Sequence, residues 1–321
     1  MKAVIERWLH RRWYGDIVPG LGLRALAGAY RVLSARRSGS APGRPLVPVI
    51  VVGNFTAGGT GKTPLVIALA RHFSARGFTP GIVSRGHGRR TAAPVQVGPD
   101  TPVEICGDEP FLMREKTGVP VLVDSDRVAA ARAAVDAGCD LVIADDGLQH
   151  RRLARDLEIE VVDGERRYGN GLLLPAGPLR EMPRPCDFRV INGRDAVDGD
   201  WLMQLVPGDA VNVSYRTRRR ALSEFSSGAA VHAVAGIGNP ARFFNSLRDL
   251  GLGVIEHPFA DHHQFRAEDF SGMTGPILMT EKDAVKCRRI GLQDAWSVPV
   301  EARLPVGFLA AVEDRLKEKH A

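Results

Sequence analysis

The sequence predicts an α/β fold in which a mostly parallel β-sheet is flanked by helices and followed by a smaller α/β domain. From residue 48 onward, short apolar runs alternate with helix-like segments, as strand–helix–strand units do. The run LVIA at 141–144 has no polar residue, which favours a strand buried on both faces. The first apolar run ends in a glycine-rich bend followed by Lys62 and Thr63, a pattern typical of loops that bind phosphate.

Size and composition are those of an ordinary soluble protein. The chain has 321 residues, enough for one large or two modest domains, with 44% hydrophobic and 25% charged residues. Its four cysteines are scattered and form no CxxC pair. We therefore expect neither a disulfide framework nor a zinc site, and a reducing compartment fits.

Positive charge is concentrated in residues 1–44. This segment has nine basic and two acidic residues, so its charge of +7 exceeds the +6 of the whole chain. Nucleic-acid binding would more naturally spread such charge over a domain face, so we expect no nucleic-acid partner. Arginines interrupt the apolar stretches, so we expect neither a secretory signal nor a membrane-spanning helix.

The same segment predicts one basic amphipathic helix. Leu23, Leu26, Ala27, Tyr30 and Leu33 recur at helical spacing, with arginines beside this stripe and aromatic residues upstream. A helix of this kind is typical of proteins that lie on an anionic membrane surface. The alternative is a helix that packs on the core and keeps its arginines in solvent.

Beyond a Ser/Gly/Pro connector at 38–48, the apolar pattern predicts six strands and three helices in order. The strands are expected at 48–53, 80–84, 120–124, 140–145, 158–162 and 187–191, and the helices at 62–76, 110–117 and 126–137. The pattern weakens around 192–230 and a second α/β block follows. We predict an N-terminal membrane-associating segment at 1–44, a nucleotide-binding domain at 45–212, and a smaller α/β domain at 213–321 that closes over the nucleotide.

The stretch TAGGTGKT lies between a predicted strand and a predicted helix. Its glycines let backbone N–H groups point inward, its lysine can reach the β- and γ-phosphates, and its last hydroxyl can bind Mg²⁺. The helix N-terminus favours an anion as well. Threonine at position 56 replaces the usual glycine, so Gly53 and Gly58 are expected to supply flexibility. The fold is therefore of the P-loop NTPase type, and its ATP contacts are expected from Thr56, Ala57, Gly58, Gly59, Thr60, Gly61, Lys62 and Thr63.

A phosphate loop of this type needs a carboxylate for its metal. The run LVIA ends in Asp145 and Asp146, which a parallel sheet would bring to its C-terminal edge beside the loop. Asp145 or Asp146 is expected to bind Mg²⁺, directly or through water. The alternative is a plain turn, for which Asp-Asp-Gly is well suited.

Two further loops contain charged residues close to predicted strand ends. In SRGHGRR, Arg85 either clamps phosphate and steadies transferring charge or belongs to a solvated basic loop. In CGDEP, Asp108 directly precedes a predicted helix. The residues alone favour an N-cap role for Asp108 over a general base.

The second half of the chain adds candidate residues. FADHHQF contains His262 and His263, either of which could accept a proton when paired with a carboxylate, or both could be ordinary loop histidines. The apolar, proline-rich stretch at 170–185 contains Arg180 and is expected to form a wall for a substrate. The stretch MTEKDAVK favours a helix cap after a strand.

Together these motifs resemble the tetraacyldisaccharide 4′-kinase family, the lipid A 4′-kinases of Gram-negative bacteria. They follow the family's order over about residues 48–286. The matching segments are VGNFTAGGTGKTP, SRGHGRR, GDEP, DDGLQHRRL, LLPAGPLREMP, DHHQF and TEKDAVK. Thr56 agrees with the family's loop, whereas His87 stands where many relatives have tyrosine.

The resemblance implies an activity and a location. The reaction is ATP- and Mg²⁺-dependent phosphorylation of the 4′-hydroxyl of a tetraacylated glucosamine disaccharide 1-phosphate, which gives lipid IVA in lipid A biosynthesis. The enzyme would be monotopic on the cytoplasmic face of the bacterial inner membrane, with the acylated disaccharide lipid and an anionic membrane surface as partners. We expect a monomer.

The resemblance also assigns roles to residues. The family's proposed base corresponds to Asp108, which reverses the preference for a cap, and its assisting histidine corresponds to His262, with His263 as the alternative. Lys62 completes the expected catalytic set. Substrate contacts are expected from Arg85, Gln149, His150 and Arg180.

A second class of function fits part of the pattern. A P-loop regulatory ATPase that recruits a protein partner to the membrane would share the loop, the carboxylate and the amphipathic helix. Such switches usually lack a second domain with a His/Asp pair and an apolar Pro/Gly loop. Phosphate transfer to a glucosamine disaccharide lipid, compared with partner-stimulated ATP hydrolysis, distinguishes the two.

Overall fold

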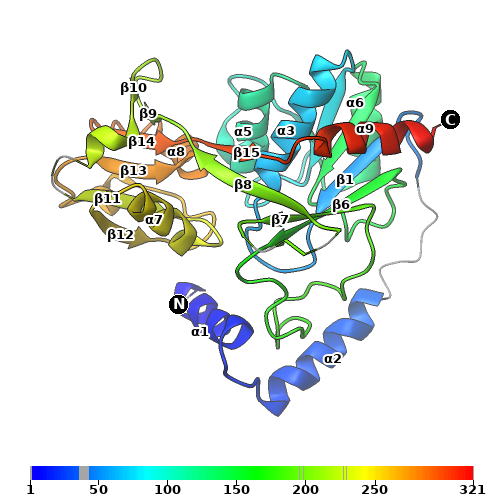
Figure 1. The fold of residues 1–321 in the computed structure, drawn as a ribbon, viewed down its shortest axis with the longest axis horizontal. Helices are drawn as coiled ribbons and strands as arrows, with labels where there is room; N and C mark the ends of the chain where they lie inside the picture. The colour runs from blue at the N-terminus through cyan, green and yellow to red at the C-terminus, as the bar shows by residue number, and fades with distance from the viewer. Residues whose placement is uncertain are drawn as a thin grey trace.

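Two β-sheets organise the molecule. The computed structural model describes residues 2–35, 43–194, 196–197, 199–226, 228 and 230–320, so residues 38–42 of the predicted connector at 38–48 lie outside the described residues. Within these ranges, nine strands form one sheet and six form another. Figure 1 shows the two sheets in separate bodies side by side, with two N-terminal helices below them.

The large sheet has a parallel centre and antiparallel edges. Its parallel strands, in spatial order, are β8 (Trp201–Pro207), β7 (Phe188–Asn192), β6 (Leu157–Asp163), β1 (Val49–Gly53), β5 (Leu141–Asp145), β2 (Pro80–Ser84) and β4 (Val121–Val123). Antiparallel strands β15 (Val300–Arg303) and β3 (Val95–Gln96) lie at the two edges. The predicted α/β class with a mostly parallel sheet is confirmed.

Helices cover both faces of this sheet because its strands are apolar on both sides. Along β1, Ile50 and Val52 pack into one core while Val49 and Val51 pack into the other. The first core contains side chains of α3 (Lys62–Ala75), α5 (Asp108–Thr117) and α9 (Phe308–Glu318). The second contains side chains of α6 (Arg127–Asp136) and α2 (Leu21–Ala35).

The six predicted strands and three predicted helices are confirmed to within two residues at each end. The short helix α4 (Val103–Cys106) and the strands β3 and β8 were not predicted. Helix α5 begins at Asp108, and Gly107 occupies the N-cap position with φ 96°. The interpretation of Asp108 as an N-cap is therefore wrong by one residue.

The small sheet is mixed and has its own helices. Its strands, in spatial order, are β10 (Arg219–Arg220), β9 (Ala210–Asn212), β14 (Ala295–Val298), β13 (Ile277–Thr280), β11 (Val231–Ala235) and β12 (Val254–Pro258). Helices α7 (Pro240–Asp249) and α8 (Glu281–Cys287) and the 3₁₀ turns Leu222–Phe225 and Ala267–Phe270 accompany it. We call the body built on this sheet the small domain and the rest the large domain.

The chain crosses between the domains twice, and this changes the predicted division. It leaves the large sheet after β8 and returns to it after β14, and Gly208 N–H donates to the Pro299 carbonyl (2.9 Å) where the two crossings meet. The predicted small domain at 213–321 therefore included β15, which is a strand of the large sheet, and α9, which packs in the core on that sheet. Phe308 of α9 is fully buried in the large domain's core. Apolar periodicity is the same in both domains and gives no sign of this return.

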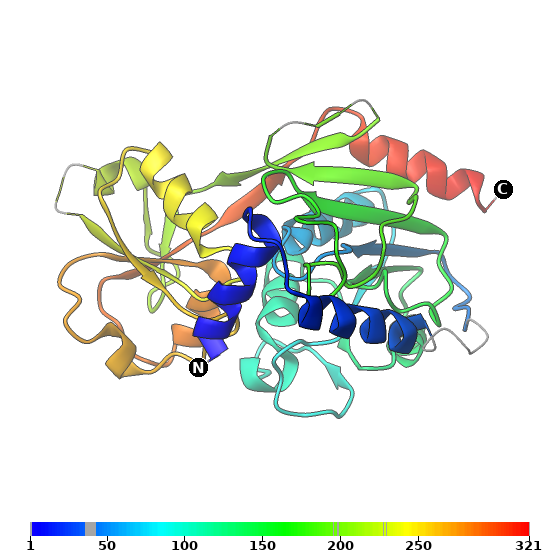
Figure 2. The ribbon, with the colours of Figure 1, turned by 90° about the horizontal axis from the view of Figure 1, so that it is seen from below.

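The N-terminal segment forms two helices rather than one. Helix α1 (Lys2–Tyr14) runs along the border between the domains, and α2 runs beneath the large domain (Figure 2). The predicted apolar stripe divides into two parts: Leu23, Ala27 and Tyr30 pack against the core, whereas Leu26 and Leu33 are exposed.

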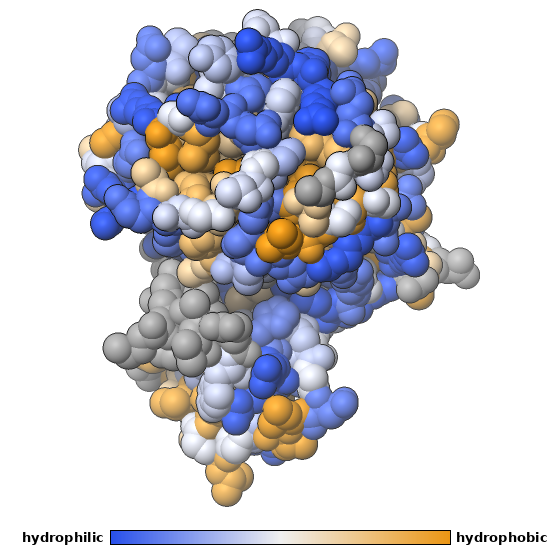
Figure 3. All heavy atoms as spheres, turned by 90° about the vertical axis from the view of Figure 1, so that its left-hand side faces the viewer, coloured by the Kyte–Doolittle hydropathy of each residue, from blue (hydrophilic) through white to orange (hydrophobic). Residues whose placement is uncertain are grey.

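Apolar side chains gather at the outer end of this segment. In Figure 3 they appear at the lowest tip of the molecule, where Figure 1 places the α1–α2 connection. The exposed large apolar residues of the segment are Ile17, Val18 and Leu21 at the connection, and Trp8, Leu26, Val32 and Leu33 on the two helices. Of the helices described, none has the length and apolar character to cross a bilayer.

Candidate active site

The phosphate loop connects β1 to α3 and has the backbone that anion binding requires. Gly58 (φ 100°) and Gly61 (φ 94°) are in the left-handed region. A Cβ on Gly61 would lie 2.2 Å from Asn192 Nδ2, so only glycine fits there. The Thr60 hydroxyl is buried and has no hydrogen-bond partner among the described residues, as expected of a group that faces a bound anion.

Thr56 is accommodated by the loop's entry. Its hydroxyl and its carbonyl both accept hydrogen bonds from Asn54 Nδ2, at 3.2 and 2.8 Å. Gly58 supplies the unusual backbone angle, as predicted. Gly53 does not, because it lies in extended β1, where a Cβ would meet Leu148 at 2.6 Å. Gly53 therefore provides space for packing rather than flexibility.

Asn54 is the centre of the first side-chain cluster, and the sequence interpretation missed it. Lys62 Nζ donates to Asn54 Oδ1 (2.9 Å), and the Arg180 guanidinium donates to the same oxygen. Gln149 Nε2 donates to the Asn54 carbonyl (2.9 Å). The available signal was a polar residue at the end of an apolar strand, directly before the loop.

Asp146 joins this cluster as a fully paired carboxylate. Arg180 grips both of its oxygens, at 2.9 and 2.8 Å, and Lys62 Nζ lies 3.4 Å away. Burial disfavours the charge on Asp146, but Lys62 and Arg180 hold its pKa well below the ordinary value. Asp146 has φ 52°, which turns its side chain toward these cations.

Asp145 differs, because one of its oxygens is unused. Ser84 Oγ donates to Asp145 Oδ2 (3.1 Å), while Oδ1 is buried and has no partner among the residues described. Burial, followed by the charges of Glu109 and Asp146, raises the pKa of Asp145 to about 7. A buried carboxylate oxygen without a partner, close enough to Lys62 of the phosphate loop for their charges to interact, fits a bound Mg²⁺.

A second cluster joins the two domains through Asp108 and His262. Asp108 Oδ2 lies 3.1 Å from His262 Nδ1, and Lys286 Nζ lies 4.0 Å from the same oxygen. Burial favours neutral Asp108, but Lys282 and the hydrogen bond with His262 hold its pKa well below the ordinary value. Burial opposes the charge on His262, whereas its hydrogen bond with Asp108 raises its pKa. His263 instead contacts Asp269 (2.9 Å) and not Asp108.

The small domain also supplies two lysines from α8. Lys282 donates to Glu109 (2.8 Å) and Lys286 pairs with Asp283 (2.8 Å). Thr280 caps α8 by accepting from the Asp283 N–H, which confirms the predicted helix cap. Lys282 was missed as a site residue because its partner is 173 positions away in the sequence.

The remaining predicted site residues are less closely engaged. Arg85 is exposed and makes no hydrogen bond within the ranges that the structure describes. Burial and the neighbouring charge of Arg127 lower the pKa of His150, whose Nε2 is buried without a partner among described residues. The His87 ring lies 4.8 Å from the His262 ring, centroid to centroid.

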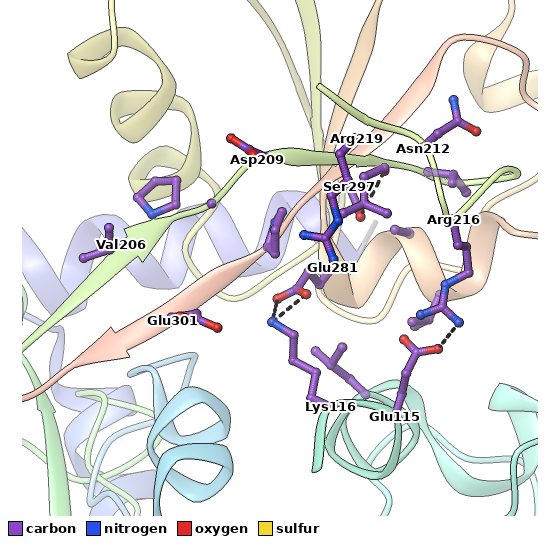
Figure 4. A pocket seen from close by; sticks show the side chains of 18 of the residues that line it. Glu115, Lys116, Val206, Asp209, Asn212, Arg216, Arg219, Glu281, Ser297 and Glu301 are labelled. Atoms are coloured by element: carbon purple, nitrogen blue, oxygen red, sulfur yellow. Dashed lines mark hydrogen bonds and ion pairs between the residues drawn. The ribbon is translucent and has the colours of Figure 1, made fainter. Parts of the chain in front are cut away.

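A cavity of about 700 Å³ lies beside the two segments that cross between the domains. It is lined by both crossing segments and by α5 and α8. Ion pairs from α5 to the small domain span it, Lys116 with Glu281 (2.7 Å) and Glu115 with Arg216 (2.6 Å), as Figure 4 shows. These pairs link the domains beside the crossing segments, and the contact between Asp108 and His262 is a further link between them.

Comparison with known proteins gives one consistent result. The model of the family described as "LpxK: Tetraacyldisaccharide-1-P 4'-kinase" matches residues 20–317. The tetraacyldisaccharide 4'-kinase of Xanthomonas euvesicatoria pv. vesicatoria (strain 85-10) is 53% identical over 329 residues, which cover 95% of each chain. The protein of the same name from Xylella fastidiosa (strain 9a5c) is 52% identical over 331 residues, with the same coverage.

A solved structure agrees over nearly the whole chain. LpxK from Aquifex aeolicus, described as an "apo" form in complex with ATP, superposes with a TM-score of 0.72 at 25% identity. The match covers 92% of the present chain and 98% of the Aquifex chain. The architecture, including the small domain, is thus shared by that protein.

Proposed function

The chain belongs to the tetraacyldisaccharide-1-P 4'-kinase family, and from that premise we propose how its residues transfer the γ-phosphoryl group of ATP to the 4′-hydroxyl of a tetraacylated glucosamine disaccharide 1-phosphate. The observation that carries the proposal is the contact between Asp108 and His262, 3.1 Å apart across the two domains. A regulatory ATPase has no need for a buried carboxylate–histidine pair of this kind beside its phosphate loop, so that alternative is not favoured.

Asp108 acts as the general base in this proposal. It is ionised at neutral pH and stands at the first residue of α5, near the edge of the sheet where Asp145 ends β5. The 4′-oxygen forms a bond to the γ-phosphorus as the bond from phosphorus to the ADP oxygen breaks, and the hydroxyl proton passes to Asp108. His262 orients Asp108 and tunes its affinity for that proton.

The phosphate loop positions ATP. Its backbone N–H groups and Lys62 hold the β- and γ-phosphates. Thr63 and Asp145 would hold Mg²⁺, which neutralises charge on the phosphates when bound. We assign the direct contact to Asp145, because Asp146 is already paired with Arg180 and Lys62.

Substrate contacts are proposed for the residues that surround this edge of the sheet. Arg180 and Gln149 are held against Asn54, beside Lys62, so both can face a sugar phosphate or its hydroxyls. Arg85 is exposed on the loop after β2 and can steady negative charge, and His150 follows Gln149. The stretch at 170–185 buries Leu173, Ala176 and Leu179 in the core of the large domain, and we propose its outer side as a wall for the substrate.

The decisive test is transfer of ³²P from γ-labelled ATP to a tetraacylated glucosamine disaccharide 1-phosphate in mixed micelles. The proposal expects a labelled lipid whose formation depends on both Mg²⁺ and the chain. ATP hydrolysis without lipid labelling, stimulated by a protein partner, would support the regulatory ATPase instead.

The raised pKa of His262 leads to a pH prediction. Below that pKa, His262 is an imidazolium that keeps Asp108 a weak base, and above it neutral His262 lets Asp108 accept a proton more readily. We expect kcat to rise with pH through a value above 6.5, and His262→Gln to remove that rise. Both pH profiles are measured with the same MgATP. The titration of ATP then affects both proteins equally and cancels in the comparison.

Stability should depend on pH in the opposite sense. Because the folded pKa of His262 is raised, its pair with Asp108 contributes stability that is full below about pH 6.5 and is lost as the pH rises through the folded pKa. The difference in melting temperature between wild type and His262→Gln should therefore shrink between pH 6 and 8. If the melting temperature and kcat of the two proteins change with pH in parallel, His262 does not tune Asp108.

The N-terminal helices are proposed to place the enzyme on the cytoplasmic face of the inner membrane. Val18 and Leu21, at the α1–α2 connection, are 72% and 84% exposed. Arg24 and Arg31 are on the same helix as Leu33 and can meet anionic headgroups. The substrate lipid stays in the bilayer, so this contact brings the active site to it.

Replacing Val18, Leu21 and Leu33 together by serine should release the protein from vesicles that contain phosphatidylglycerol. Each apolar side chain contributes about 1.5–3 kcal/mol when it leaves water. The partition coefficient of the triple variant between vesicles and water should therefore fall more than tenfold. The matched control changes three exposed apolar residues elsewhere, Leu250, Ile255 and Val306. Equal binding by both triple variants in a flotation assay would place the membrane contact elsewhere.

A further inference from the structure

Arg166, in the turn after β6, contacts both the phosphate loop and the small domain. Its Nη2 donates to the Gly59 carbonyl (2.5 Å) and its Nη1 to the Gly238 carbonyl (3.2 Å). Gly59 belongs to the phosphate loop, and Gly238 belongs to the loop between β11 and α7. These loops touch directly, since a Cβ on Gly238 would lie 2.5 Å from the Gly59 nitrogen. One guanidinium thus bridges two backbones at their closest approach.

The guanidinium is held in place by Asp163, at the C-terminal end of β6. Arg166 Nε donates to Asp163 Oδ2 (3.0 Å), and the Asp163 side chain is 2% exposed. Asp163 also pairs with Arg242 in the first turn of α7 (2.8 Å). Burial disfavours its charge, but Arg166 and Arg242 lower the pKa of Asp163. The carboxylate therefore stays ionised and fixes the direction of the guanidinium fork.

Fixing the Gly59 carbonyl also fixes the next N–H group. In a planar trans peptide, the C=O and the following N–H point in opposite directions. Arg166 holds the Gly59 carbonyl from outside, so the Thr60 N–H points into the loop. Asn192 has the same effect one residue later, because its Nδ2 donates to the Thr60 carbonyl (2.8 Å) and so turns the Gly61 N–H inward.

We propose that Arg166 is a positioning residue that orients the phosphate loop for ATP and couples this loop to the small domain and to helix α1. The coupling to α1 follows from two contacts. Arg166 Nη1 lies 3.5 Å from His10 Nε2, and its Cζ lies 5.4 Å from the Tyr14 ring centroid. The segment that carries the exposed apolar residues is therefore one side chain away from the phosphate loop. The proposal depends on the proposed function only in that ATP is the ligand of this loop.

The test measures the dissociation constant of MgATP by calorimetry on the full chain without lipid. Arg166→Ala removes two charge-assisted hydrogen bonds and should weaken binding about tenfold or more. Arg166→Lys keeps the charge beside Asp163 but not the fork, so it should recover binding in part. The control, Arg248→Ala, removes an exposed partner of Glu256 and should bind ATP as the wild type does.

The kinetics separate positioning from a structural role. Positioning predicts a higher KM for ATP in Arg166→Ala with an unchanged KM for the lipid, at a temperature where melting curves show the variant folded. ATP binding by Arg166→Ala as tight as in the wild type would overturn the proposal. Failure of the wild type itself to bind ATP would instead count against the proposed function.

The link to α1 is tested by a double-mutant cycle. Tyr14→Ala should weaken ATP binding several-fold in the wild type and have no effect in Arg166→Ala, because its influence passes through Arg166. Trp8→Ala is the control on the same helix, since Trp8 stacks on Arg12 and does not contact Arg166. The same fold-change for Tyr14→Ala in both backgrounds would overturn the coupling to α1.

Discussion

An Asp108→Asn variant is expected to lose about a hundred- to ten-thousandfold in kcat and to bind MgATP with nearly unchanged affinity. Asparagine has the same shape but cannot accept the hydroxyl proton. The effect should fall on kcat because, in the proposed mechanism, Asp108 faces the acceptor and not the nucleotide. Transfer of ³²P to the lipid gives kcat, and calorimetry gives the ATP affinity.

The fold should survive this substitution, because the lysines near Asp108 have other partners. Lys282 pairs with Glu109 (2.8 Å) and Lys286 with Asp283 (2.8 Å), so neither is left as an isolated buried charge. Asp314→Asn, an exposed change on α9, is the matched control. A loss confined to the ATP affinity, with kcat intact, would mean that Asp108 is not the base.

The parts predicted from sequence were those with a local cause. β1 and β5 were found because they are apolar on both faces, and α3 because the glycine-rich bend demands a helix behind it. The loop between β1 and α3 and the two aspartates at the end of β5 follow from the same local patterns. No knowledge of the three-dimensional arrangement was needed for them.

The parts that were missed depend on contacts between distant segments. Asp108 and His262 are 154 positions apart and lie in different domains, so the residues alone favoured a helix cap, and only the family resemblance joined them. The sequence around Asn54 indicated only the end of a strand. Its role appears in the structure, where Lys62, Arg180 and Gln149 all donate hydrogen bonds to it. The return of β15 to the large sheet could not be predicted either. The sequence of an edge strand does not indicate which of two sheets it joins, and β15 pairs with β8.

Asp145 and Asp146 are adjacent in the sequence but differ in their contacts and in the pKa of their carboxyl groups. Asp145 is buried with one oxygen unpaired and a pKa raised by burial to about 7, whereas Asp146 is turned by its positive φ toward Arg180 and Lys62. The alternation of a strand points successive side chains to opposite sides, and the left-handed residue after β5 adds a further rotation. The end of β5 thus supplies one carboxylate with an unpaired oxygen, Asp145, and one that pairs with two cationic side chains, Asp146.

Replacing Lys62 by alanine is expected to lower kcat about a hundred- to a thousandfold or more and to weaken ATP binding as well. Lys62 supplies the charge that stabilises the β- and γ-phosphates during transfer, and a single preorganised group of this kind has effects of that size. The melting temperature should change little, because Asp146 keeps its two hydrogen bonds with Arg180 (2.9 and 2.8 Å) and Asn54 keeps its contact with the same arginine.

The control for this variant is Lys317→Ala, which removes an exposed lysine that pairs with Glu313 on α9. Both proteins lose one positive charge, so a difference between them reflects the position of Lys62 and not the net charge of the chain. Near-normal phosphate transfer by Lys62→Ala would remove the phosphate-loop role. Lys62 would then serve only to pair with Asp146 and Asn54, as it does in this structure, and not to bind ATP.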